Sequence, residues 1–239
     1  MPASKKISMN ICKRCDEDFP DIEMINGMCL HIFEKLEGEA PSCVPNKHKY
    51  SRFSNFQQIS SDHTQMLNFC RDQLANNLSI YLAGRQGCGK SHLAAACASE
   101  LNRLGRDVVY NTFAEYLYSL ADPSYDDKME AEKWTLKHYA SNEYVILDDV
   151  GQGHSISKLS PLVSRLYDEN RNIVITSNLN IEQLAQEIGS VIPSRLTEMC
   201  GGKDKIMYFD LLDYRLLTRA EKDAFAEKYK TEAKIDFPI

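Results

Sequence analysis

The sequence of 239 residues lacks two features that would assign it to a class at once: a long apolar run and an excess of positive charge. No apolar stretch approaches the roughly 20 residues that a membrane-spanning helix needs, and residues 1–8 are polar and lead into no apolar leader. We therefore expect a cytoplasmic protein without a membrane partner. The net charge of −6 provides no global basic field, so any contact with nucleic acid must be local or arise in an assembled oligomer.

The most informative stretch is Gly84–Ser91, which reads Gly-Arg-Gln-Gly-Cys-Gly-Lys-Ser and matches the phosphate-binding pattern G-x-x-x-x-G-K-[ST]. Residues 78–83 before it are apolar, as in a buried parallel strand, and residues 91–104 after it carry apolar side chains at helical spacing. Because this pattern requires the order strand, glycine loop and helix, the stretch predicts a nucleotide site. An ordinary Gly-rich turn with a surface lysine is the alternative.

The residue types in this loop suit phosphate binding. Glycines let backbone N–H groups turn toward a phosphate, and a helix that begins near Gly89 points its positive dipole end at the same anion. We expect Lys90 to bridge the β- and γ-phosphates and the Ser91 hydroxyl to bind Mg²⁺. The expected nucleotide-binding residues of the loop are Gly84, Arg85, Gln86, Gly87, Cys88, Gly89, Lys90, Ser91 and the backbone of His92.

A second landmark is the apolar stretch 143–150, which ends in the adjacent carboxylates Asp148 and Asp149. A strand buried beside the loop's own strand would bring Asp148 to the Mg²⁺ shell, while Asp149 orients or polarises the attacking water. ATPases of this broad class more often have glutamate at the second position, and the shorter Asp149 reaches less far. Helix capping by the two acids is the alternative interpretation.

Three more candidate residues follow downstream. Residues 172–178 predict a strand that ends in Asn178, whose amide can hold the lytic water or sense the γ-phosphate. Arg195 lies on a predicted short helix, where a surface salt bridge is the alternative, and Arg215 follows the last predicted strand.

The alternation of apolar strands and amphipathic helices predicts an α/β fold with a parallel five-stranded sheet. The strands are expected over 78–83, 107–112, 143–150, 172–178 and 205–212, and the longer helices over 62–75, 91–104, 113–120, 128–140, 159–169, 181–188 and 218–230. Residues 51–239 are expected to form this domain and residues 1–50 a separate module. The polar, proline-containing stretch 41–56 is interpreted as the linker between them.

Four of the eight cysteines, Cys12, Cys15, Cys29 and Cys43, lie in the first 43 residues. The first two have the C-x-x-C spacing that lets two thiolates bind one tetrahedral ion. The fourth ligand would be Cys43, His31 or His48. Because the segment has few apolar residues for a core, a metal would supply stability, and we predict a small zinc-binding module. A helical or flexible appendage with reduced cysteines is the alternative.

Together these motifs resemble the AAA+ ATPases of the DnaC/DnaI helicase-loader group, which includes the IstB transposition helpers. The likeness covers residues 53–215 and depends on five matches: the glycine loop followed by His-Leu-Ala, Leu-Asp-Asp-Val-Gly ending at Gly151, Ile-Thr-Ser-Asn-Leu ending at Leu179, Ser-Arg-Leu ending at Leu196, and Asp-Tyr-Arg ending at Arg215. The resemblance implies a three-layer AAA+ P-loop fold with a reduced lid, hydrolysis of ATP, and Mg²⁺ as cofactor. The Asp-Asp pair looks ordinary within this group.

By this resemblance Asn178 would be sensor 1, Arg195 the arginine finger and Arg215 a candidate sensor 2. An arginine remote from its own γ-phosphate acts only across a subunit boundary, so the active species should be a head-to-tail ring or spiral oligomer. The resemblance further implies loading of a hexameric replicative DNA helicase onto single-stranded DNA. The cysteine-rich module, similar to the zinc-bearing region of the DnaI-like loaders, would bind the helicase.

Other functions remain open at this point. An IstB-like helper would bind duplex DNA and recruit a transposase, and a nucleotide-dependent adaptor or inhibitor would bind the helicase with little turnover. A DnaA-like initiator is less favoured, because residues 216–239 leave little room for a separate DNA-binding domain. Arg85 and the loop 151–158 are candidates for DNA contact.

Overall fold

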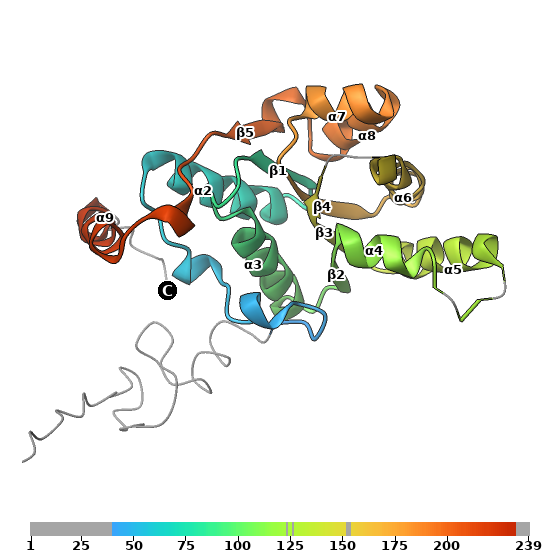
Figure 1. Cartoon of the computed structure of the whole chain (residues 1–239), viewed down its shortest axis with the longest axis horizontal. Helices are drawn as coiled ribbons and strands as arrows, with labels where there is room; N and C mark the ends of the chain where they lie inside the picture. Colours follow the sequence, from blue (N-terminus) through green and yellow to red (C-terminus); the bar gives the residue numbers. More distant parts are fainter. Residues whose placement is uncertain (1–39, 123, 126, 152–153, 233–239) are drawn as a thin grey trace, which may run out of the picture.

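The computed structural model describes residues 40–122, 124–125, 127–151 and 154–232 (Figure 1). A single sheet of five parallel strands has the order β2-β3-β4-β1-β5. The α/β class with its parallel five-stranded sheet is confirmed, and each expected strand forms, the last one shorter than expected. The strands are β1 Ile80–Gly84, β2 Val108–Thr112, β3 Tyr144–Val150, β4 Asn172–Ser177 and β5 Met207–Phe209.

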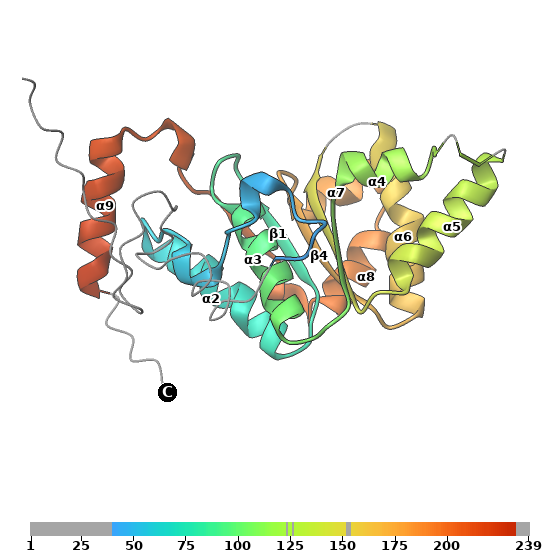
Figure 2. The ribbon, with the colours of Figure 1, turned by 90° about the horizontal axis from the view of Figure 1, so that it is seen from below.

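Helices cover both faces of the sheet and give three layers (Figures 1 and 2). One face packs against α2 Ser61–Ala75 and α3 Lys90–Arg103. The other packs against α4 Phe113–Ser119, α5 Lys128–Ala140, α6 Leu159–Asp168, α7 Ile181–Ile188 and α8 Val191–Met199. The two apolar cores, one on each side of the sheet, hold the strands in a fixed plane, so the carboxyl ends of the strands form a defined edge.

Alternation along β3 decides which side chains meet α3. Val145 and Leu147 belong to the core under α4 to α8, whereas Tyr144 and Ile146 belong to the core under α2 and α3. Because successive side chains in a strand point to opposite faces, Asp148 follows Ile146 onto the α3 side. The backbone pattern alone therefore directs this carboxylate toward the glycine loop.

The stretch 41–56 differs from the expected linker, because it packs on the α3 side of the domain. Val44 and Phe56 are each only 7% exposed and belong to the same core as α3. The stretch contains two short 3-10 helices, η1 Asn46–His48 and η2 Phe53–Asn55. The free energy gained by burying these apolar side chains is sufficient to hold the stretch on the domain, although most of its residues are polar.

After β5 the chain forms η5 Tyr214–Leu216 and then α9 Arg219–Glu232, the helix expected over 218–230. Figures 1 and 2 show α9 at the end of the molecule opposite α5. Lys222 Nζ lies 4.7 Å from the centre of the Tyr214 ring and so links the start of α9 to η5. Within the described part of the chain, no helix has the length and apolar character needed to cross a bilayer.

Candidate nucleotide site

The glycine loop connects the carboxyl end of β1 to the amino end of α3, at the edge of the sheet where β3 and β4 also end. Lys90 is 8% exposed, and its Nζ donates hydrogen bonds to Gly84 O at 2.8 Å, Arg85 O at 2.6 Å and Asn178 Oδ1 at 2.9 Å. Two predicted residues that are 88 positions apart, Lys90 and Asn178, are thus in direct contact. Burial lowers the pKa of Lys90, and the nearby Cys88, Asp149 and Asp148 side chains counteract this effect.

Two glycines of the loop are required by close packing as well as by backbone conformation. Gly87 has φ +72°, and a Cβ there would lie 1.7 Å from Asp213 Oδ1. Gly89 has φ +95°, and a Cβ there would lie 2.6 Å from Cε2 of Phe56. A side chain at either position would have to displace Asp213 or Phe56 and would also adopt a left-handed backbone that only glycine adopts readily. Phe56 also lies near the His92 ring, with ring centres 5.4 Å apart, and connects the 41–56 stretch to the loop.

The predicted acidic pair ends β3, which is not the direct neighbour of β1 that was expected, because β4 lies between these two strands. The two members of the pair have different surroundings. Asp148 is 6% exposed, and the Thr176 hydroxyl donates to its Oδ1 at 2.5 Å. Asp149 is exposed and has φ +61°, and its N–H donates to Thr176 Oγ1 at 2.8 Å. The register between β3 and β4 shifts at this point, between Leu147 and Val150. One carboxylate is fixed inside the site and the other faces outward at its rim.

The remaining loop residues differ in exposure. Cys88 is 1% exposed, and burial raises the pKa of its thiol, so it is not a reactive thiolate. Arg85 and Gln86 are exposed, and Arg85 Nε pairs with Asp210 Oδ1 at 2.5 Å. Ser91 is the residue after Lys90 and lies in the first turn of α3.

Arg215 is connected to the loop through Asp213. Its Nε and a terminal guanidinium nitrogen donate to the two carboxylate oxygens of Asp213 at 3.1 and 3.2 Å. These bonds to Arg215 hold the pKa of Asp213 below its usual value. The neighbouring Tyr214 N–H donates to Gly87 O at 3.1 Å. The end of the fold after β5 is thus docked on the glycine loop through Tyr214 and Asp213.

Arg195 lies apart from this cluster, on α8, which packs on the opposite face of the sheet from α3. Its guanidinium carbon lies 5.0 Å from the centre of the Tyr167 ring of α6. The Tyr167 hydroxyl donates to Glu198 Oε2 at 2.8 Å. The aromatic face supports the guanidinium in a half-buried position.

The predicted zinc ligands Cys12, Cys15 and Cys29, and the alternative His31, lie outside the described residues. Cys43 is described, and its Sγ accepts a hydrogen bond from Tyr110 N–H at 3.3 Å. His48 Nδ1 lies 3.3 Å from Ser51 Oγ. From residue 40 to 232, apart from the short gaps, no group of three or more potential ligand side chains is placed to hold a metal ion.

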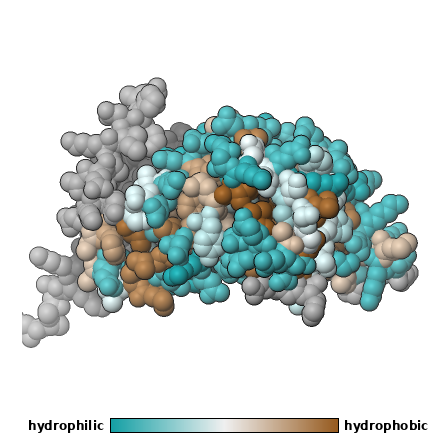
Figure 3. All heavy atoms as spheres, turned by 90° about the horizontal axis from the view of Figure 1, so that it is seen from above, coloured by the Kyte–Doolittle hydropathy of each residue, from teal (hydrophilic) through white to brown (hydrophobic). Residues whose placement is uncertain are grey.

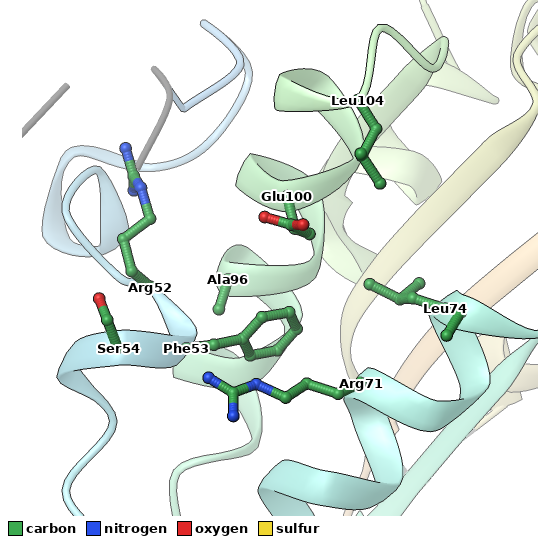
Figure 4. A pocket seen from close by; sticks show the side chains of 9 residues that line it. Arg52, Phe53, Ser54, Arg71, Leu74, Ala96, Glu100 and Leu104 are labelled. Carbon is green, nitrogen blue, oxygen red and sulfur yellow. The ribbon is translucent and has the colours of Figure 1, made fainter. Parts of the chain in front are cut away.

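A separate groove of about 630 Å³ lies away from the glycine loop, against the second half of α3 (Figure 4). Figure 4 shows Phe53 and Arg71 side by side in it, and Arg71 Cζ lies 5.6 Å from the centre of the Phe53 ring. None of the predicted nucleotide residues lines this groove. Its lining comprises Arg52, Phe53, Ser54, Arg71, Leu74, Ala75, Ala96, Glu100 and Leu104.

Three contributors to the site were missed by sequence reasoning: Phe56, Thr176 and Asp213. In the sequence, Asp213 stands out only as part of Asp-Tyr-Arg, and Thr176 only as part of the strand that ends in Asn178. The available signal for Thr176 was a pair of hydroxyl residues, Thr176 and Ser177, at the end of the apolar run 173–175. Phe56 carried no signal, because its role depends on packing against Gly89.

The donors and acceptors present fit a nucleotide with its magnesium ion: a glycine loop at a helix start, a buried lysine, a hydroxyl and a buried carboxylate at one sheet edge. On this fold, the arrangement defines an ATP-binding domain of the P-loop type.

The chain belongs to the family of IstB-like ATP binding proteins, whose model matches residues 43–197. It is 29% identical over 164 residues to the uncharacterized protein YdaV of Escherichia coli K12, covering 65% of each chain. It is 24% identical over 157 residues to the replicative helicase loader DnaC of the same organism, covering 62% of this chain and 64% of DnaC. The aligned regions thus span slightly less than two thirds of either relative.

Among solved structures, the crystal structure of DnaI superposes with a TM-score of 0.56 at 20% identity, covering 70% of this chain and 91% of that one. This likeness establishes a shared fold. The predicted membership of the DnaC/DnaI and IstB group, and the AAA+ fold, are confirmed.

Proposed function

We propose that this protein is an ATP-dependent loader of a hexameric replicative DNA helicase onto single-stranded DNA during replication initiation. The observation that carries the proposal is the similarity to DnaC over 157 residues, combined with a site in which Lys90 donates to Asn178 and the charges of the acidic pair act on Lys90. An assembled nucleotide site lets ATP binding and hydrolysis drive the transfer of a partner.

In this proposal the loop and Lys90 hold the phosphates, and Ser91 and Asp148 hold the magnesium ion, which neutralises charge on the transferred phosphoryl group. Asp149 and Asn178 position the attacking water. The contact between Lys90 Nζ and Asn178 Oδ1 supports this role for Asn178, because it places the amide within reach of the lysine that meets the γ-phosphate. Arg215, held by Asp213 next to Gly87, is proposed to contact the bound nucleotide.

Arg195 is proposed to act on the nucleotide of a neighbouring subunit in a head-to-tail oligomer. Its location on α8, on the opposite face of the sheet from α3, supports a role in trans. Figure 3, which looks down on the side of β5, α7 and α8, shows apolar surface among the hydrophilic residues. Val191, Tyr208, Leu212 and Leu216 are the large exposed apolar side chains between α8 and η5, and they suit contact with a second copy.

The N-terminal module is proposed to bind the helicase and to contain a zinc ion held by Cys12, Cys15, Cys29 and a fourth ligand. Cys43 packs on the ATPase domain through Tyr110, so His31 competes with it for the fourth position. Protein purified without chelator should contain about one zinc ion per chain. A zinc content near zero would reject the metal without affecting the nucleotide site.

The first test is a pull-down with the host's replicative helicase, with and without ATP. The full chain is compared with a chain that begins at Ala40, because a cut at residue 50 would remove Val44 from the core. Helicase binding that is lost with residues 1–39 supports a loader architecture. Absence of binding under every condition rejects it.

The second candidate is an IstB-like helper that binds duplex DNA and recruits a transposase. It is favoured by the family match, which is to IstB-like proteins and covers 43–197. ATP-dependent assembly on duplex DNA, together with no contact to the helicase, would select this function over the loader.

A further inference from the structure

Thr176 on β4 is the hydroxyl that connects the two acidic residues of the site. It is 1% exposed, donates to Asp148 Oδ1 at 2.5 Å and accepts from Asp149 N–H at 2.8 Å. One buried oxygen atom thus bonds the side chain of one residue and the backbone of the next. The short distance to an acidic acceptor is typical of a charge-assisted hydrogen bond.

The need for this bridge follows from the path of β3. If the strand continued regularly, Asp149 would alternate onto the face of Val145 and Leu147 and enter the core under α4 to α8. Instead the register shifts, with Leu147 opposite Ile175 but Val150 opposite Ser177, and Val150 takes the core position. The extra residue turns Asp149 outward.

This bulge requires left-handed backbone at Asp149, with φ +61°, a conformation that non-glycine residues rarely adopt. Such a conformation persists only when its surroundings hold it. The bond from Asp149 N–H to Thr176 Oγ1 is made at this residue itself. Because the same hydroxyl also donates to Asp148, the orientation of both carboxylates depends on Thr176.

We propose that Thr176 is a positioning residue for ATP hydrolysis, which fixes the buried carboxylate for the magnesium ion and the bulge that presents the second carboxylate to the attacking water. Thr176 does not reach the nucleotide in this account; it acts through Asp148 and Asp149. Loss of the Thr176 hydroxyl therefore weakens Mg²⁺ binding and slows turnover, while the glycine loop and Lys90 keep their affinity for ATP.

The test compares Thr176→Val, which removes the hydroxyl at nearly constant volume, with Thr176→Ser, which keeps it. Loss of residues that orient a metal-binding group typically reduces activity or metal affinity about 10- to 100-fold. For Thr176→Val we expect kcat to fall by that factor and the half-saturating Mg²⁺ concentration to rise, with the Kd for a fluorescent ATP analogue within about threefold of wild type. Thr176→Ser should restore turnover to within about threefold.

The neighbouring Ser177 provides a matched control. It is fully buried on the same strand and also bridges to β3, donating to Val150 O at 2.6 Å and accepting from Leu179 N–H at 3.0 Å. Its bonds involve backbone groups and neither carboxylate. Ser177→Ala should therefore lower the melting temperature without the change in Mg²⁺ dependence.

Two results would overturn the proposal. One is Thr176→Val turnover within twofold of wild type at limiting Mg²⁺. The other is an equal loss of kcat in Ser177→Ala, which would assign the effect to strand stability. If Thr176→Val is too unstable to purify, the magnesium dependence of Thr176→Ser against Thr176→Cys decides, since a thiol is a weaker donor and acceptor than a hydroxyl.

Discussion

Replacing Lys90 with alanine tests the nucleotide site at its buried positive charge. A hydrogen bond to a charged group contributes about 1.5–3 kcal/mol, so contacts with two phosphates would contribute about 3–6 kcal/mol. Gly84 O, Arg85 O and Asn178 Oδ1 compete for the same ammonium group, which favours the lower end of this range. About 3 kcal/mol corresponds to a loss of roughly 100-fold in ATP affinity.

The assay is a titration with a fluorescent ATP analogue, followed by steady-state hydrolysis at saturating Mg²⁺. Lys90→Ala should bind at least about 100-fold more weakly and hydrolyse no ATP above background. Lys205→Ala, which removes an exposed lysine of the η4 turn, is the control for loss of a positive charge. Circular dichroism verifies that the variant is folded. Wild-type turnover in folded Lys90→Ala would refute the assignment of the loop.

Three further predictions concern the finger and pH. Arg195→Ala should leave ATP binding intact but remove the hydrolysis that is stimulated by assembly; unchanged stimulation, measured against protein concentration, would reject the finger. Burial lowers the pKa of His92 below 6.5, so the unfolded chain takes up this proton more readily than the folded one, and the free energy of unfolding should fall as pH drops below about 6.5. The free energy of unfolding of His92→Gln should fall less than that of the wild type between pH 7.5 and 5.5, as measured by denaturant unfolding. An equal fall in both proteins would exclude His92 as a source of this pH dependence. Burial raises the pKa of Cys200 to about 12 from 9.0, so stability that is present below pH 9 should be lost as pH rises toward 12. Cys200→Ala should show a shallower loss across that window, and an unchanged slope would assign the loss elsewhere.

Local pattern was sufficient to predict the sheet and the loop. The strands before Gly84 and before Asp148 are short apolar runs bounded by turn residues, and the helix that begins at Lys90 follows at the required spacing. These signals arise from neighbouring residues, so they can be detected in one sequence. The placement of Lys90, Asn178 and the acidic pair at one edge also followed, because the carboxyl ends of parallel strands share an edge. The order of the strands did not follow, since β4 and not β3 lies beside β1.

Contacts between distant residues and departures from regular geometry could not be predicted. The stretch 41–56 is polar in composition, yet Val44 and Phe56 are buried in the domain. Which side chain packs on a glycine depends on the tertiary arrangement, as with Asp213 against Gly87. The bulge at Asp149 depends on excluding a carboxylate from the core and on a hydroxyl 27 positions away, and neither is visible in a local pattern.

The most direct test of the central claim is helicase loading onto closed circular single-stranded DNA, where a hexameric ring has no free end to thread. The amount of helicase transferred to the circle is measured with the full chain, with Lys90→Ala and without either protein. The account predicts that the full chain and ATP together load the helicase, whereas Lys90→Ala does not. Equal loading in all three conditions, or none with the full chain and ATP, would contradict it.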